Sequence, residues 1–179
     1  LVQYDLPAGW QMALDERSAV SEPLPTGNAI FFRQALAPTT AVNDRGQDVI
    51  KQIADVDGRA AETGVVDRRF LGFATPHTLT LSFDTPLDEV TPGTPVLLFN
   101  GWIEYPYSQT MFAAWQAGIP YDAPTLEARG EDGEWKTVLP QFGFMAGMPR
   151  QATVPLPIDK LPHKTTQLRL STNLEIYWD

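Results

Sequence analysis

The sequence predicts a mostly β protein, an antiparallel β-sandwich of the jelly-roll or galactose-binding-like kind with one or two short helices. Three observations predict this class. Apolar and polar residues alternate with period two in several stretches, as in half-buried strands. Sixteen Pro and 13 Gly divide the 179 residues into short pieces, which is typical of all-β folds. Helical periodicity is confined to two segments of about two turns each.

We expect one domain over residues 1–179, because the composition changes nowhere abruptly and a chain of this length can bury a substantial core. Residues 1–40 are its least regular part. Within them, residues 29–36 are predicted to form a strand.

The middle of the chain contains both predicted helices and the clearest internal strands. Residues 48–54 and 109–116 each place their apolar side chains on one side of a short helix. Residues 78–84 alternate strictly, so the three apolar side chains share one strand face. Residues 95–102 form a continuous apolar run, which favours a strand that is buried on both faces.

Residues 125–129 and 134–139 are predicted to pair as a hairpin. They are joined by Gly130-Glu-Asp-Gly133, and Asp-Gly supplies the positive-φ residues that tight turns require. Residues 151–156 are a further predicted strand.

The chain closes with LRLSTNLEIYWD, residues 168–179, predicted as a last strand. The alternate residues that share the face predicted to point into the core are Leu168, Leu170, Leu174, Ile176 and Trp178. The polar Thr172 interrupts this series of apolar residues, which indicates a bend or bulge beside Asn173. Glu175 lies on the opposite face of the strand and is therefore predicted to point into solvent.

Charge and composition disfavour several classes of protein. Lys and Arg number 13 against 22 Asp and Glu, a net charge of −9, so a phosphate-coated nucleic acid is not an expected partner. The chain has no run of about 18 apolar residues that could span a bilayer. Zero Cys excludes disulfides, thiolate metal sites and a Cys nucleophile within this chain.

The sequence predicts neither a metal nor another cofactor. His77 and His163 are far apart in the sequence and belong to no metal-binding motif. Asp55-Val-Asp-Gly58 has the composition of a calcium loop, but Arg59 and Val66 occupy the fifth and twelfth positions, where the pattern needs oxygen ligands.

Catalysis is not favoured either. Glycosidic hydrolysis needs two convergent carboxylates. The acids beside aromatic residues are Glu104, Glu175 and Asp179, and an acid-rich chain supplies such residues by chance. No Gly-x-Ser-x-Gly motif nominates a nucleophile.

The densest aromatic stretch, residues 101–121, is the candidate ligand site. Flat rings and hydroxyls with polar partners suit a sugar or a peptide. The candidate residues are Trp102, Glu104, Tyr105, Tyr107, Gln109, Trp115 and Tyr121. The alternative is that the two tryptophans belong to the core and the tyrosines cover an edge of the sandwich.

Residues 69–81, 100–105 and 143–150 and the closing stretch together resemble a β-rich module of bacterial secreted proteins, found appended to FG-GAP-like or tetratricopeptide repeats. The resemblance spans roughly residues 40–179. It implies a periplasmic or extracellular location in the bacterial envelope, other domains of a larger protein as partners, and a non-enzymatic role. The chain begins at Leu1 without Met, as expected of a processed protein or an excised domain.

The expected function is therefore that of a non-catalytic binding or structural module, with a glycan or a protein as ligand. The alternative is a carbohydrate-binding accessory domain or a carbohydrate-active enzyme that uses the aromatic segment 102–121.

Overall fold

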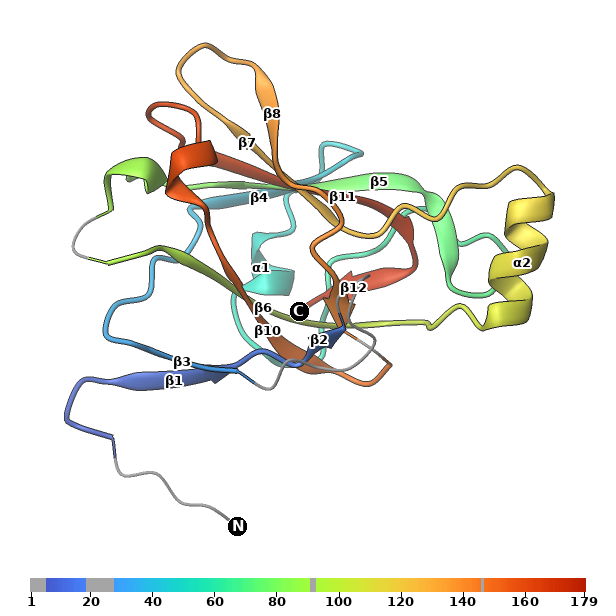
Figure 1. Cartoon of the computed structure of the whole chain (residues 1–179), viewed down its shortest axis with the longest axis horizontal. Helices are drawn as coiled ribbons and strands as arrows, with labels where there is room; N and C mark the ends of the chain where they lie inside the picture. Colours follow the sequence, from blue (N-terminus) through green and yellow to red (C-terminus); the bar gives the residue numbers. More distant parts are fainter. Residues whose placement is uncertain (1–5, 19–27, 91–92, 146) are drawn as a thin grey trace.

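The computed structural model describes residues 6–18, 28–90, 93–145 and 147–179. The predicted fold class is confirmed, because the structure is 39% strand and 12% helix and its sheets are antiparallel. Figure 1 shows a five-stranded and a three-stranded sheet that lie one above the other as the two layers of a sandwich.

The larger sheet has the strand order β4-β5-β11-β7-β8. Its strands are β4 (Thr40–Asn43), β5 (Phe73–Ser82), β7 (Thr125–Arg129), β8 (Trp135–Leu139) and β11 (Gln167–Leu174). The predicted hairpin is confirmed, since β7 pairs with β8. Gly133, at φ +78°, donates its N–H to the carbonyl of Gly130 at 3.1 Å.

The smaller sheet has the order β10-β6-β12, with β6 (Val96–Ile103), β10 (Arg150–Pro155) and β12 (Ile176–Trp178). Strand β6 is mostly half-buried, so the prediction of a strand buried on both faces is wrong for it. Two short ribbons also form, β1 (Gln11–Leu14) with β3 (Ala29–Phe32) and β2 (Arg17–Ser18) with β9 (Phe144–Met145).

In the described part of residues 1–40, the regular structure consists of the short strands β1, β2 and β3 and the first residue of β4. Residues 1–5 and 19–27 lie outside the described residues. The strand predicted over 29–36 ends at Phe32 as β3.

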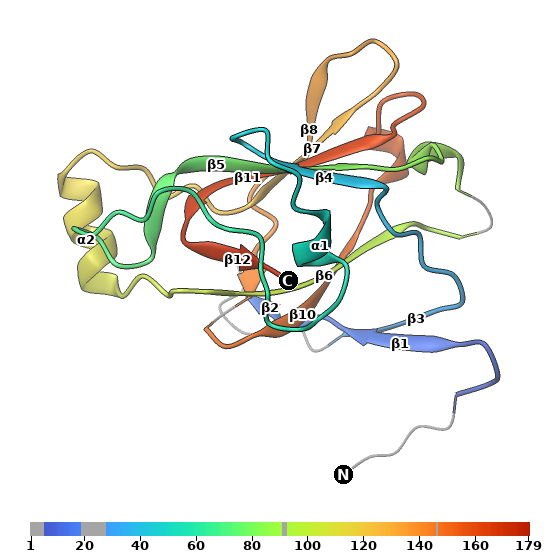
Figure 2. The same ribbon diagram turned by 180° about the vertical axis from the view of Figure 1, so that it is seen from behind.

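Figures 1 and 2 show the two sheets facing each other, and the cluster of buried apolar side chains is contributed by both. The larger sheet contributes the apolar side chains on one face of β5 and β11, including Leu79, Leu81 and Leu170. The smaller sheet contributes Trp178, whose ring meets Phe99 edge-to-face at a centroid distance of 5.4 Å. Full burial of each large apolar side chain stabilises the fold by about 1.5–3 kcal/mol.

Both predicted helices form. Helix α1 (Ile50–Ile53) is shorter than the predicted 48–54, and α2 (Ser108–Gln116) lies close to the predicted 109–116. Two single 3₁₀ turns, η1 (Leu87–Glu89) and η2 (Ile158–Lys160), lie in connections. Helix α2 stands at one end of the molecule, beyond the strands, in both Figure 1 and Figure 2.

The closing stretch contains two strands in place of the predicted one. The prediction that five apolar residues of this stretch point into the core is confirmed, since all of them are buried: Leu168, Leu170, Leu174, Ile176 and Trp178. The predicted irregularity is also confirmed, as a register shift between Thr172 and Leu174. However, β11 belongs to the larger sheet and β12 to the smaller, so the chain crosses between the layers at Glu175.

The prediction that Glu175 points into solvent is wrong, because this residue is only 6% exposed. Strand parity predicts exposure only while the chain stays within one sheet. A residue at the crossing is enclosed by neighbouring segments. Here the N–H of Glu175 donates to the carbonyl of Gly72 at 2.9 Å, and its carbonyl accepts from Glu104 at 3.1 Å.

Candidate functional site

The aromatic segment contains both packed and exposed rings. Trp102 stacks on Tyr177 with ring centroids 5.2 Å apart, and Tyr121 packs edge-to-face on Phe73 at 6.3 Å. The other candidates are exposed: Glu104, Tyr105, Tyr107, Gln109 and Trp115. The alternative to a ligand site, in which Trp102 and Trp115 both belong to the core, is therefore wrong for Trp115, which is 70% exposed.

Two of the three acids are brought close together. The backbones of Glu104 and Glu175 are hydrogen-bonded, and the charges of both side chains act on the Tyr177 hydroxyl. Asp179 has a structural role, because its carboxylate accepts hydrogen bonds from the N–H groups of Asp57 at 3.3 Å and Gly58 at 3.1 Å. These bonds account for the conformation of the stretch that resembles a calcium loop.

The Glu175 side chain is held by Tyr177. The phenol donates to Oε1 of Glu175 at 2.8 Å, whereas Oε2 is buried and has no hydrogen-bond partner among the described residues. Burial, this hydrogen bond and the negative charges of Glu175 and Glu104 raise the pKa of Tyr177 to about 12. A phenol that donates to a carboxylate resists ionisation, because ionisation would place two anions side by side.

The raised pKa predicts a loss of stability at alkaline pH. Between pH 10.0, the ordinary pKa of tyrosine, and about 12, the unfolded chain releases the Tyr177 proton and the folded chain retains it. The free energy of unfolding therefore decreases as the pH rises through this window. We expect a smaller decrease for Tyr177→Phe, measured by urea unfolding at a series of pH values. An identical pH dependence in both proteins would contradict the assignment.

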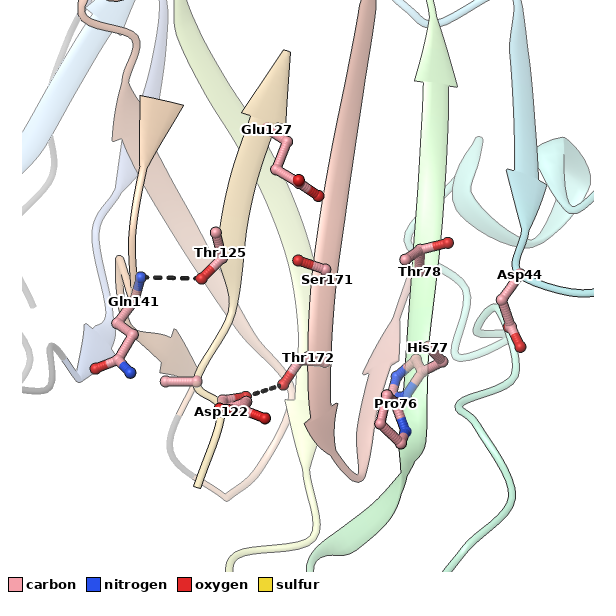
Figure 3. Close-up of a pocket in the computed structure, with 11 residues that line it drawn as sticks. Asp44, Pro76, His77, Thr78, Asp122, Thr125, Glu127, Gln141, Ser171 and Thr172 are labelled. Carbon is pink, nitrogen blue, oxygen red and sulfur yellow. Dashed lines mark hydrogen bonds between the residues drawn. The ribbon is translucent and has the colours of Figure 1, made fainter. Parts of the chain in front are cut away.

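A polar groove crosses the outer face of the larger sheet, as Figure 3 shows. Its volume is about 350 Å³. It is lined by Asp44, Pro76, His77, Thr78, Asp122, Ala123, Thr125, Glu127, Gln141, Ser171 and Thr172. We call it the sheet groove. None of the seven residues predicted from the sequence lines it.

Three hydroxyl-bearing residues form a row along the floor of the sheet groove. Ser171 on the central strand β11 lies directly opposite Thr78 of β5 on one side and Thr125 of β7 on the other. Figure 3 shows this row, with Asp44 beyond Thr78 at one end and Asp122 beside Thr172. The alternate residues of these strands, including Leu79, Leu126 and Leu170, are buried in the core, so the row stands on a packed sheet.

The walls of the groove are held by specific hydrogen bonds. The Thr172 hydroxyl donates to the carbonyl of Asp122 at 2.7 Å, and the Asn173 side chain accepts from the N–H of Asp122 at 3.0 Å. The N–H of Gln141 donates to the Thr125 hydroxyl at 3.2 Å. These bonds fix the segments that present Asp122 and Gln141 to the groove.

Two titratable groups of the groove are already engaged. Glu127 accepts two hydrogen bonds from Arg169, at 2.7 and 2.9 Å. Nδ1 of His77 lies 2.9 Å from the Thr75 carbonyl, which can only accept, so Nδ1 carries the proton and Nε2 accepts from the Thr63 hydroxyl at 3.2 Å. Burial lowers the pKa of His77, which keeps the ring neutral.

The remaining polar side chains of the groove are available to a ligand. Within the described part of the chain, no hydrogen bond engages the side chains of Asp44, Thr78, Asp122, Gln141 and Ser171. Reasoning from the sequence missed all of them. In the sequence, the only hint of this groove is that every second residue of 78–82, on the side facing away from the core, carries a hydroxyl group. The alignment of Thr125, Ser171 and Thr78 depends on strand register.

One cluster of metal-ligating side chains occurs in the described ranges. Ligand atoms of Asp88, Glu89 and His163 lie within 4.8 Å of one another on the surface. Both oxygens of Asp88 accept backbone N–H groups, from Lys164 at 2.9 Å and Thr165 at 2.8 Å. These bonds explain the position of the carboxylate, and we assign no metal to the cluster.

Comparison of the chain with protein-family models, curated proteins and solved structures found no match. Among the helices of the described residues, none has the length and apolar character needed to cross a membrane.

Proposed function

We propose that this protein is a non-catalytic β-sandwich binding module whose sheet groove binds a carbohydrate. One observation carries the proposal: a groove of about 350 Å³ on a packed sheet presents five polar side chains that make no hydrogen bond within the described residues. This volume falls within the range of about 300–1,000 Å³ that is usual for small-molecule sites.

The chemistry of the lining supports a neutral, hydroxyl-rich ligand. A sugar hydroxyl both donates and accepts hydrogen bonds. Asp44 and Asp122 can accept from it, Gln141 can do either, and the hydroxyls of Thr78 and Ser171 can also do either. The two unpaired carboxylates disfavour anionic ligands, because they would repel a phosphate or carboxylate group.

The engaged state of Glu127 and His77 disfavours catalysis by these two groups. A general base needs a free lone pair within reach of the substrate. Arg169 occupies the carboxylate of Glu127, and Thr75 and Thr63 occupy the two ring nitrogens of His77. The resemblance seen in the sequence supports a place in a bacterial secreted or envelope protein.

A glycan array tests this function. Wild-type protein is expected to bind one group of neutral glycans, and the double variant Thr78→Ala/Ser171→Ala is expected to lose at least about tenfold in affinity, since two hydrogen-bonding groups are removed. Thr40→Ala is the matched control, because Thr40 lies on the same sheet outside the groove. Binding that survives the double variant but is lost in Trp115→Ala would assign the glycan to the aromatic segment and contradict the proposal.

A further inference from the structure

The polar side chains of the sheet groove form a line that runs across the strands. Figure 3 shows Asp44 beyond Thr78 at one end of this line and Gln141 beyond Thr125 at the other, with Ser171 in the middle. The three hydroxyl-bearing residues come from β5, β11 and β7, which are neighbours in the sheet. Ser171 is paired in register with the other two. The groove therefore presents its binding groups in a row perpendicular to the strands.

The groove is bounded in the direction along the strands. On one side, the next pair on the same face is Arg169 and Glu127, which are in register and joined by hydrogen bonds of 2.7 and 2.9 Å. The Arg169 guanidinium also lies 4.2 Å from the centre of the Trp135 ring. On the other side, the Thr172 hydroxyl ties the carbonyl of Asp122 to β11 at 2.7 Å. An elongated ligand therefore fits across the strands and not along them.

The row offers the same pair of groups on both sides of Ser171. The β5 side has the Thr78 hydroxyl and, from the end of β4, the Asp44 carboxylate. The β7 side has the Thr125 hydroxyl and, from the segment that leads into β7, the Asp122 carboxylate. Neither carboxylate makes a hydrogen bond through its side chain within the described residues. Because a carboxylate has two acceptor oxygens, each half of the groove can receive two adjacent hydroxyls of one sugar unit.

We propose that the sheet groove binds two consecutive sugar units of a linear neutral glycan, one over Thr78 and one over Thr125, with their linkage over Ser171. This inference rests on the proposed carbohydrate binding and adds the length and the direction of the ligand. Neighbouring strands are about 4.8 Å apart, close to the length of one sugar unit in a linear glycan. The row from β5 to β7 spans two such spacings, roughly 10 Å, which matches a disaccharide.

Isothermal titration calorimetry with sugars of increasing length tests the proposal. The probes are the maltose, cellobiose and mannobiose series, each as mono-, di- and trisaccharide. In at least one series the disaccharide is expected to bind at least about tenfold more tightly than its monosaccharide, because it occupies both halves of the groove. The trisaccharide is expected to stay within about threefold of the disaccharide, because its third unit extends beyond the row.

Thr78→Val and Thr125→Val test the two halves separately, since valine keeps the branched shape and lacks the hydroxyl. Each variant is expected to weaken disaccharide binding at least about fivefold. A site for a single sugar unit would be sensitive to only one of them. Thr80→Val is the matched control, because Thr80 is the next residue on the same face of β5 and lies outside the groove. Thermal unfolding of each variant verifies that the fold is retained.

Three results would overturn the two-unit site while leaving carbohydrate binding in the groove as the function. They are a monosaccharide that binds as tightly as its disaccharide, a trisaccharide that gains a further tenfold, and a disaccharide whose affinity depends on only one of the two threonines. Absence of saturable binding in all three series would also overturn the inference. The glycan array then decides separately whether the proposed function holds.

Discussion

Trp178→Ala is expected to lower the free energy of unfolding by about 3–5 kcal/mol, the usual cost of deleting a large buried aromatic side chain. Trp178 is 5% exposed and lies between the two sheets, with Phe99 packed against its ring. Its backbone pairs with Gly101 on one side and Ala61 on the other. The surrounding strands are therefore held in place and cannot collapse fully into the space left by the indole.

Trp115→Ala is the matched control for this prediction, because it deletes the same side chain from an exposed position. Its effect on the free energy of unfolding is expected to stay within about 0.5 kcal/mol. Urea unfolding compares the two variants. Equal losses of stability would contradict the assignment of Trp178 and the other inward-pointing residues of the closing stretch to the core.

Gly72→Ala is the second substitution with a large expected effect, a loss of about 2–5 kcal/mol. The residue has φ +85°, a region that an L side chain enters only with strain. Its new Cβ would also lie 2.5 Å from the carbonyl oxygen of Glu104 and 2.6 Å from the nitrogen of Pro106. Both are backbone atoms, which cannot move aside as the end of a flexible side chain can.

Gly58→Ala separates the two contributions. Gly58 has φ +79°, but a Cβ there would meet no atom within 4 Å. Only the backbone strain of about 1–2 kcal/mol is then expected. If thermal unfolding gave the same loss for both glycine variants, the close approach of residues 72, 104 and 106 would be wrong, and with it the enclosure of Glu175.

Local pattern was sufficient to predict most of the fold. Period-two alternation identified the inward residues of β11 and β12, and the Asp-Gly turn identified the hairpin between β7 and β8. The position of Glu175 could not be predicted, because the transfer of the chain from one sheet to the other changes the partners of a residue without changing the alternation.

The candidate sites were less predictable than the fold. Trp102 and Trp115 belong to the same aromatic stretch, yet one stacks on Tyr177 and the other is exposed on α2. The sheet groove depends on Thr78, Thr125 and Ser171, which are distant in sequence and become neighbours only through strand register. Long-range pairing of this kind leaves no signal in a single sequence.

The most direct test of carbohydrate binding in the sheet groove is a ¹⁵N–¹H NMR titration with neutral mono- and disaccharides. We predict saturable shift changes for at least one sugar, concentrated at the amides of Thr78, Thr125 and Ser171, and their loss in Thr78→Ala/Ser171→Ala. Shift changes confined to α2, or no saturable change with any of the sugars, would contradict the account.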